Sequence, residues 1–248
     1  MYQKLAIVIL LFTILSCNSE QGKQESPKED VPKSLKVNLN GLKLDFSEPV
    51  IIDSSVYVMY PLVLEEDDDE DRVYSSSGGS TTFWNILFYN TANGEYHLLD
   101  ETKKMVIHSY APENSNGSSI SEVEYRESGL SQVDKLLYYT VTTTDYNKDG
   151  KINSEDPTYL FISDDSGKKF KQISPNGMNV DSWKIISGTN RVLLKVTKDS
   201  NNDETFNEKD EVVPMVYNLK ENKVSSEIFS EDFKLKLKEQ LQKQWPDK

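Results

Sequence analysis

Short runs of β-branched and aromatic residues, separated by polar turn residues, dominate the chain from residue 34 onward. Examples are "FWNILFYN", "KLLYYTVTT" and "EVVPMVYN". Val, Ile, Tyr, Phe and Thr are enriched in strands, whereas Gly, Asn, Asp and Ser favour the turns between them. The pattern therefore predicts a single β-rich domain over residues 34–248.

The predicted strands fall into three passages with one layout, over residues 45–100, 104–174 and 182–229. Each passage has two strands, an acidic loop, a third strand, a tight turn and a fourth strand. Gly94 and Gly167 occupy the tight turns of the first two passages, where tolerance of positive φ is required. The layout predicts an all-β fold of repeated four-stranded antiparallel meanders, in a propeller-like or a sandwich arrangement.

Two of these passages resemble a known repeat. "YLFISDDSGKKFKQISP" and "FWNILFYNTANGEYHLL" are similar to the third and fourth strands of TolB-type propeller repeats. There, a strand ending in an acidic or amide residue continues through a Gly turn into a short strand. The resemblance covers roughly residues 45–230 and implies blade-like units. Because a closed ring generally needs at least four blades, a sandwich or open array of meanders is an equal alternative.

The C-terminal segment, residues 230–245, has a helical period instead. Its apolar residues recur every four positions and share one helical face: Phe233, Leu237, Leu241 and Trp245. Ser230 is a suitable N-cap followed by two acidic residues, and Pro246 ends the segment. We expect this helix to pack over an open end or edge of the sheet, and the alternative is a helix that binds a partner.

The N-terminal segment predicts export. An apolar run of residues 5–15 precedes Cys17, the single cysteine. The run is short for a membrane span and suits the hydrophobic region of a secretory signal. The motif "ILSC" at its end resembles a bacterial lipobox, which implies a lipoprotein signal peptide over residues 1–17 and acyl chains such as palmitate on Cys17. The alternative is an ordinary signal peptide with an incidental cysteine.

The lipobox resemblance implies a cell-envelope protein, lipid-anchored to the outer membrane on its periplasmic or surface-exposed side. Residues 18–33 ("NSEQGKQESPKEDVPK") have no apolar periodicity and predict a disordered tether between the lipid and the domain. One cysteine allows no disulfide within the chain, so any further cross-link must be of another kind, such as a metal ion.

Negative charge is concentrated in three stretches. The formal net charge of −13 is accounted for by residues 65–71, 145–156 and 199–210. Such acidity argues against nucleic acid and anionic lipid headgroups as partners. The first stretch, Glu65–Asp71, lacks the alternation that would aim ligands inward. We expect a solvated loop there, with weak and diffuse cation binding as the alternative.

The second stretch matches a twelve-residue calcium loop at every ligand position. Ca²⁺ prefers oxygen ligands, supplied in such loops by the side chains at positions 1, 3, 5, 9 and 12 and the carbonyl at position 7. The predicted ligands are Asp145, Asn147, Asp149, Lys151 through its carbonyl, Asn153 and Asp156. Gly150 at position 6 allows the sharp turn, and Ile152 at position 8 is expected to anchor the loop. The alternative is a metal-free turn rich in Asp and Asn.

The third stretch repeats the arrangement 54 residues later. The predicted ligands are Asp199, Asn201, Asp203, Thr205 through its carbonyl, Asn207 and Asp210. Glu204 replaces the glycine at position 6, where a non-glycine residue forced toward positive φ costs about 1 kcal/mol. We therefore expect this loop to bind Ca²⁺ more weakly or to turn differently.

The run "DYNKDGKINSED" also resembles the calcium loops of dockerins and EF-hands. Strand patterns flank it, however, with "LLYYTVTTT" before it and "TYLFIS" after Pro157. The resemblance therefore implies the ligand set of an EF-hand on a hairpin scaffold, as in integrin-type propeller loops.

The sequence has few features of an enzyme. Its two histidines, His97 and His108, are expected to be strand or surface residues, and no nucleophile elbow, phosphate-binding glycine loop or zinc-spaced His and Cys set occurs. We expect a non-enzymatic, calcium-stabilised lipoprotein that serves as a structural or interaction module for a protein or glycan partner. One alternative is a glycan- or peptide-binding module with Trp84 and Trp183 on an exposed face. Another is a calcium-dependent enzyme.

Overall fold

The structure is a computed structural model that describes residues 42–64, 81–111, 136–186, 189–221, 223 and 225–246. The chain divides into two units, Met1–Leu42 and Lys43–Lys248, and every described strand and helix belongs to the second. The predicted signal peptide with Cys17, the predicted tether and the acidic run Glu65–Asp71 lie outside the described residues.

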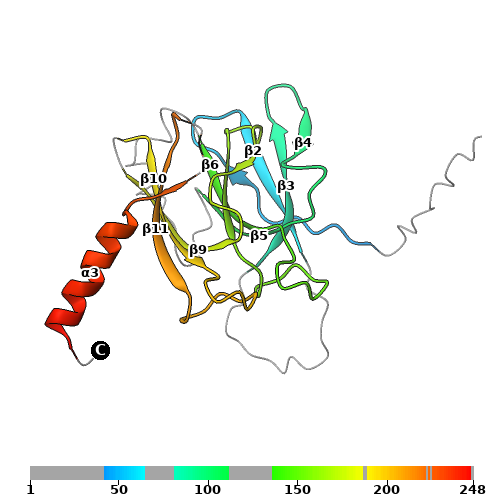
Figure 1. Ribbon diagram of the computed structural model, residues 1–248. Coiled ribbons are helices and arrows are strands. Elements are labelled where there is room, and N and C mark those ends of the chain that lie inside the picture. Colours follow the sequence, from blue (N-terminus) through cyan, green and yellow to red (C-terminus); the bar gives the residue numbers. More distant parts are fainter. Residues whose placement is uncertain are drawn as a thin grey trace, which may run out of the picture. The chain divides into compact units, whose positions relative to one another are not determined.

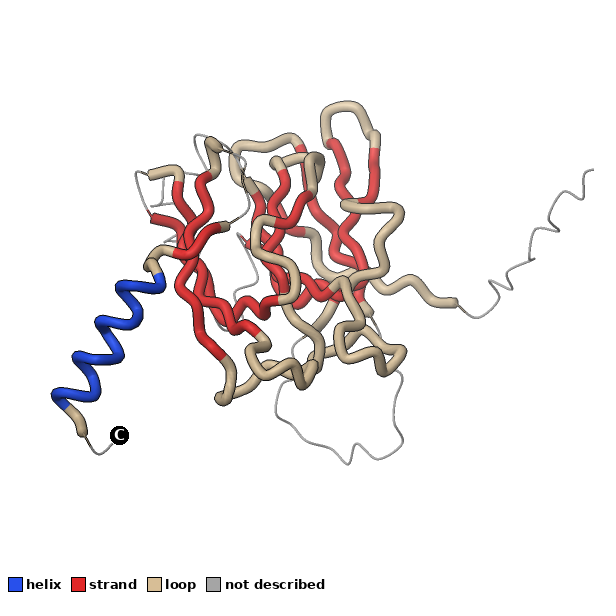
Figure 2. Tube along the Cα trace, viewed as in Figure 1, coloured by secondary structure: helices blue, strands red, loops and turns tan. Residues whose placement is uncertain are grey.

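The described part of the second unit consists of strands and a C-terminal helix (Figures 1 and 2). The elements are β1 (Val50–Ile51), β2 (Tyr57–Val63), β3 (Phe83–Asn90), β4 (Tyr96–Leu98), β5 (Val106–Ala111), β6 (Leu137–Thr142), β7 (Tyr159–Ser163), β8 (Lys171–Gln172), β9 (Met178–Ile186), β10 (Arg191–Lys198), β11 (Glu211–Asn218), β12 (Ser226–Glu227) and α3 (Glu231–Gln244). This content confirms the prediction of an all-β fold with a C-terminal helix.

The strands form three antiparallel meanders at the predicted places. β1–β4, β5–β8 and β9–β12 each pair in chain order. Gly94 and Gly167 have φ angles of +80° and +77° in the tight turns that join the third and fourth strands of the first two meanders. The prediction of a repeated four-stranded meander is therefore confirmed.

The first two meanders belong to one sheet, whereas the third is a sheet of its own. Phe83 of β3 pairs with Ile107 of β5, and this pairing joins the first meander to the second. The described strands close no barrel. Of the two predicted arrangements, the structure therefore agrees with the sandwich-like one.

The second meander is buried on both faces. In β6 and β7, Tyr139 and Phe161 pack in a core with residues of the first meander. Their neighbours Tyr138 and Leu160 point the other way, into a core shared with the third meander. Because successive strand residues face opposite sides, burial of both faces requires the uninterrupted apolar run of β7, whose five residues are all buried.

Trp183 lies in the core between the second and third meanders. Its side chain is 3% exposed and stacks on Tyr138, with the ring centroids 4.9 Å apart. Its indole Nε1 has no hydrogen-bond partner among the described residues. The alternative that places Trp183 on an exposed face is therefore wrong for this residue, because β9 turns its side chain inward together with Val180. Trp84 is half-buried.

The helix α3 has the predicted cap but does not pack as expected. The Ser230 hydroxyl accepts a hydrogen bond from the Phe233 amide. None of the helical residues is buried, and Leu237 and Leu241 are half exposed, at 50% and 52%. The prediction that the apolar face covers the sheet is therefore wrong. Within the described residues, contacts near the first turn join the helix to the domain: the Phe233 ring lies against Phe229, and Lys234 pairs with Glu227.

Over the described part of the chain, α3 included, no helix has both the length and the apolar character needed to cross a membrane.

The two histidines lie on strands, as expected. His97 in β4 hydrogen-bonds through Nε2 to the Ser166 carbonyl oxygen at 2.7 Å, and His108 in β5 hydrogen-bonds to the Thr142 hydroxyl at 2.8 Å.

Candidate calcium loops

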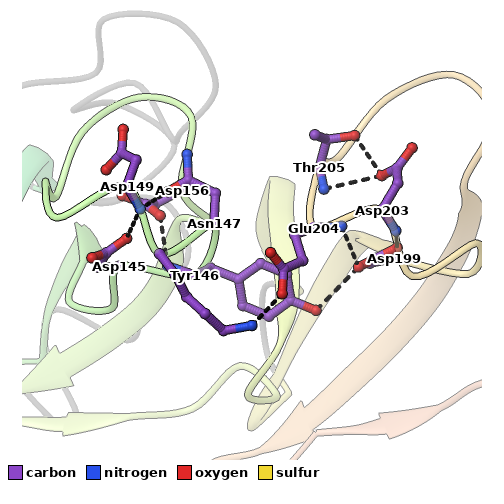
Figure 3. A network of polar contacts seen from close by, with 10 residues as sticks. Asp145, Tyr146, Asn147, Asp149, Asp156, Asp199, Asp203, Glu204 and Thr205 are labelled. Carbon is purple, nitrogen blue, oxygen red and sulfur yellow. Dashed lines mark hydrogen bonds and ion pairs between the residues drawn. The ribbon is translucent and has the colours of Figure 1, made fainter.

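The first predicted loop connects β6 to β7, so a hairpin carries it, as expected. The carboxylate of Asp145 accepts hydrogen bonds from the amides of Asp149, at 3.1 Å, and Gly150, at 2.9 Å. The carboxylate of Asp149 accepts one from the Lys151 amide at 2.8 Å. These bonds turn the side chains at positions 1 and 5 toward the inside of the loop (Figure 3).

The carboxylate of Asp156 closes this loop. It is 4% exposed, and its two oxygens accept hydrogen bonds from the amides of Tyr146 and Asn153, at 2.7 and 3.0 Å. An ionised carboxylate has about four lone-pair sites. Both oxygens of Asp156 therefore keep a lone pair that could bind a cation while the backbone stays closed.

The second predicted loop connects β10 to β11 and repeats this network 54 residues on. The Asp199 carboxylate accepts from the amides of Asp203 and Glu204, at 3.2 and 3.1 Å. The Asp210 carboxylate, 8% exposed, accepts from the amides of Ser200 and Asn207, both at 3.0 Å. Positions 1 and 12 therefore have the same role in both loops.

The backbone of the two loops turns in the same way. Lys148 and Gly150, at positions 4 and 6 of the first loop, have φ angles of +61° and +88°. Asn202 and Glu204 occupy the same positions in the second loop, with φ angles of +58° and +61°. Of the two expectations for the second loop, weaker binding or a different turn, the different turn is therefore wrong. Glu204 instead adopts the left-handed conformation, at a cost of about 1 kcal/mol.

The predicted asparagine ligands lie in the same networks. The side-chain oxygens of Asn147 and Asn201, at position 3, accept hydrogen bonds from the amides of Asp149 and Asp203, at 3.1 and 2.9 Å. The side-chain oxygens at position 9 accept from the amides two residues later, at 2.7 Å for Asn153 and 3.0 Å for Asn207.

Position 7 is predicted to contribute a backbone carbonyl from Lys151 and Thr205. The Thr205 amide and hydroxyl both donate to the Asp203 carboxylate, at 3.1 and 2.6 Å. Within the described ranges, no three His, Cys, Asp or Glu side chains are grouped so that they alone could hold a metal ion. A cation bound in either loop would therefore also depend on the asparagine and carbonyl oxygens.

The second loop is electrostatically suited to a cation. The Thr205 hydroxyl lowers the pKa of Asp203, and the amides of Asn207 and Ser200 lower the pKa of Asp210. Hydrogen bonds to an ionised carboxylate stabilise the charged form. Both side chains therefore carry their negative charge at neutral pH.

The two loops contact each other directly (Figure 3). The Tyr146 hydroxyl of the first loop donates to the Asp199 carboxylate of the second at 3.3 Å, and its ring lies 5.1 Å from that of Phe206. The Lys148 ammonium group pairs with the Glu204 carboxylate. Burial, together with the charge of Asp199, raises the pKa of Tyr146, so the hydroxyl keeps its proton as a donor.

The ligand pattern of the sequence does not predict these contacts between the loops, although the position of the loops in their meanders indicates them. Both loops join the second and third strands of consecutive meanders, so they leave their sheets at equivalent places. A cleft of about 420 Å³ between them is lined by residues of both loops, among them Asp156 and Phe206, and by Asn179 of β9.

No protein-family model matches the chain, and no curated protein is significantly similar to it. The lipobox, TolB-type and dockerin-like resemblances therefore stay predictions. The function proposed for this chain rests on the geometry of its two loops.

Proposed function

We propose that the protein is an envelope-anchored lipoprotein whose β domain binds Ca²⁺ through the two loops, as a structural or interaction module without catalysis. The observation that supports this most is the equivalence of the loops. Their carboxylates accept the same amide hydrogen bonds, although Glu204 must adopt a strained backbone conformation to keep the pattern. Strain of this kind persists where the surroundings impose it, and it is concentrated at ligand-binding sites.

The donor set favours calcium among the common cations. Each loop offers carboxylate, amide and carbonyl oxygens and no nitrogen or sulfur ligand, and Ca²⁺ accepts six to eight such oxygens with flexible geometry. Sites of extracellular modules function with dissociation constants of about 10⁻⁴ to 10⁻³ M. In an exported chain that has a single cysteine, each ion would act as a cross-link within a hairpin.

The lipid anchor on Cys17 is the second part of the proposal. Burial of an acyl chain contributes about 0.8 kcal/mol for each methylene group, so several chains hold a protein on a membrane. The predicted tether of residues 18–33 would separate the domain from the lipid surface.

Thermal unfolding of the chain with Ca²⁺ and with EDTA tests calcium binding. A ligand at a hundredfold excess over its dissociation constant stabilises the folded state by about 2.7 kcal/mol. For a domain of this size that corresponds to an increase in Tm of roughly 5–10 °C. We expect Asp145→Ala to remove most of this increase and Asp199→Ala to remove a smaller part, because Glu204 weakens the second loop.

Asp53→Ala is the matched control, since Asp53 is an exposed carboxylate in the turn after β1. This variant should keep the full increase in Tm. Equal Tm values of the unchanged chain in Ca²⁺ and in EDTA would contradict the proposal.

A glycan- or peptide-binding function is the second candidate, and one surface feature favours it. Tyr60, Leu87, Tyr89 and Tyr96 of the first meander line a shallow apolar pocket of about 370 Å³ together with Phe46. Aromatic side chains combine apolar faces with polar tips and are common at binding surfaces. Loss of saccharide retention in Tyr89→Ala, with the calcium response intact, would favour this candidate.

A further inference from the structure

We infer that the two calcium loops form one coupled unit, in which a cation bound in the first loop strengthens binding in the second. This inference rests on the proposed function, since it describes how the two proposed sites influence each other. It is carried by the contacts that residues at positions 2 and 4 of the first loop make across to the second.

Tyr146 is held by one loop and contacts the other. Its backbone amide donates to the closing carboxylate of its own loop, Asp156, at 2.7 Å. Its hydroxyl donates to Asp199, the first ligand position of the second loop, at 3.3 Å. Tyr146, which is half-buried, therefore connects position 12 of the first loop to position 1 of the second loop.

Asp199 receives hydrogen bonds from both loops on one oxygen. Its Oδ2 accepts the Glu204 amide of its own loop at 3.1 Å in addition to the Tyr146 hydroxyl. The Asp199 side chain is buried, at 9% exposed, so its orientation is set by these neighbours. Any change that fixes Tyr146 therefore also fixes the first ligand of the second loop.

Two further contacts join the loops in addition to the hydrogen bond between Tyr146 and Asp199. The Tyr146 ring packs against Phe206, at position 8 of the second loop. Lys148 pairs with Glu204, the residue that holds the strained turn at position 6. An exposed ion pair contributes less than about 1 kcal/mol, so we assign the larger share of the coupling to Tyr146.

The sign of the coupling follows from the cost of ordering these side chains. A cation in the first loop fixes Asp156 and with it the Tyr146 backbone, and the ring and hydroxyl then position Phe206 and Asp199. The second cation binds loop residues that are already ordered, so it meets a smaller loss of conformational entropy. Coupling between sites is reciprocal, so the second cation must strengthen the first site by the same factor.

Isothermal titration with Ca²⁺ measures the coupling on the full-length chain in a mild detergent. Asp149→Ala disables the first loop and Asp203→Ala disables the second. Both residues lie at position 5 and are exposed, and their hydrogen bonds stay within their own loops. The product of the two association constants of the unchanged chain, divided by the product of the two single-loop constants, gives the coupling factor.

We expect a coupling factor of at least about fivefold, the lower end of common allosteric couplings. Repeating the titrations in the Tyr146→Ala background should bring the factor close to one. Trp245→Ala, which removes an exposed aromatic side chain at the end of α3, is the matched control and should leave the factor unchanged.

Each other result has a distinct meaning. A factor of one or less in the unchanged chain overturns the coupling and leaves the proposed calcium function intact. A factor that survives Tyr146→Ala overturns the assignment to Tyr146. The absence of any Ca²⁺ binding by the unchanged chain overturns the proposed function and this inference together.

Discussion

Glycines at positive φ differ in what surrounds them. A Cβ atom added to Gly94 or Gly150 would meet no atom within 4 Å. At Gly167 it would lie 2.4 Å from the ring of Phe88, which is completely buried. A side chain at Gly94 or Gly150 would therefore cause backbone strain only. At Gly167 a side chain would also clash with Phe88, because the first and second meanders pack closely there.

We expect Gly167→Ala to destabilise the protein more than Gly94→Ala does. Strain at positive φ costs about 1 kcal/mol at either position. Overpacking against the buried Phe88 ring adds roughly 1–3 kcal/mol at Gly167 alone. Urea denaturation of both variants measures the difference, and equal free energies of unfolding would show that the turn can move away from Phe88.

His108 makes the stability depend on pH. Burial lowers the pKa of its imidazole from the ordinary value of 6.5, so the folded state favours the neutral ring that hydrogen-bonds to Thr142. The unfolded chain then binds a proton at a higher pH than the folded chain does. The stability contributed by the neutral ring is therefore complete above about pH 6.5 and is lost as the pH falls through the lower, folded pKa.

We expect His108→Gln to reduce the loss of stability between about pH 7 and about pH 5. The glutamine has no proton to gain over this interval. Free energies of unfolding from urea titrations across the interval test this, and an unchanged slope in the variant would assign the pH dependence to other groups.

At the scale of single elements, the hydrophobic pattern of the sequence predicts the bounds of the most apolar strands accurately. The runs "FWNILFYN" and "EVVPMVYN" coincide with β3 and β11 residue for residue. β9 begins at Met178, before the predicted start at Ser182. Its first half interleaves Asn179 and Asp181 with apolar residues, and hydrogen bonds of Asn179 with the Thr158 amide and of Asp181 with the Thr197 hydroxyl satisfy the polar side chains. Hydropathy cannot reveal such partners.

The helix α3 shows the reverse case, in which a strong local pattern predicted the element and not its packing. Capping and period are properties of a few neighbouring residues, so Ser230 and the apolar stripe located the helix correctly. Whether that stripe meets a sheet depends on distant residues, and the sequence has no local signal for it.

We expect deletion of the chain after Phe229 to leave the fold almost as stable as before. The helix buries none of its residues. The Lys234 side chain is 16% exposed, and it pairs with the more exposed carboxylates of Glu211 and Glu227 at the surface of the domain. Surface ion pairs contribute at most about 1 kcal/mol. Thermal unfolding of the shortened chain measures the change, and Lys234→Ala controls for the ion pairs. A decrease in Tm of many degrees would mean that α3 packs on the domain in solution.

At the scale of the whole molecule, the spacing of residues along the chain predicts which residues form each calcium loop. The contacts between the two loops depend instead on how the second and third meanders pack. The ligand pattern lies within twelve residues, so it could be recognised locally. The contact of Tyr146 with Asp199 spans 53 residues and exists because the second and third meanders share a core. Position 2 of a calcium loop is not a ligand position, and no rule of spacing gives it a role.

The core between these two meanders also provides an optical reporter. Trp183 is buried there against Tyr138, whereas Trp245 is 59% exposed and Trp84 is half-buried. A collisional quencher in water has access to the indole of Trp245 and not to that of Trp183. The fluorescence that survives quenching therefore comes chiefly from the interior, and its loss marks the moment at which the third meander separates from the second.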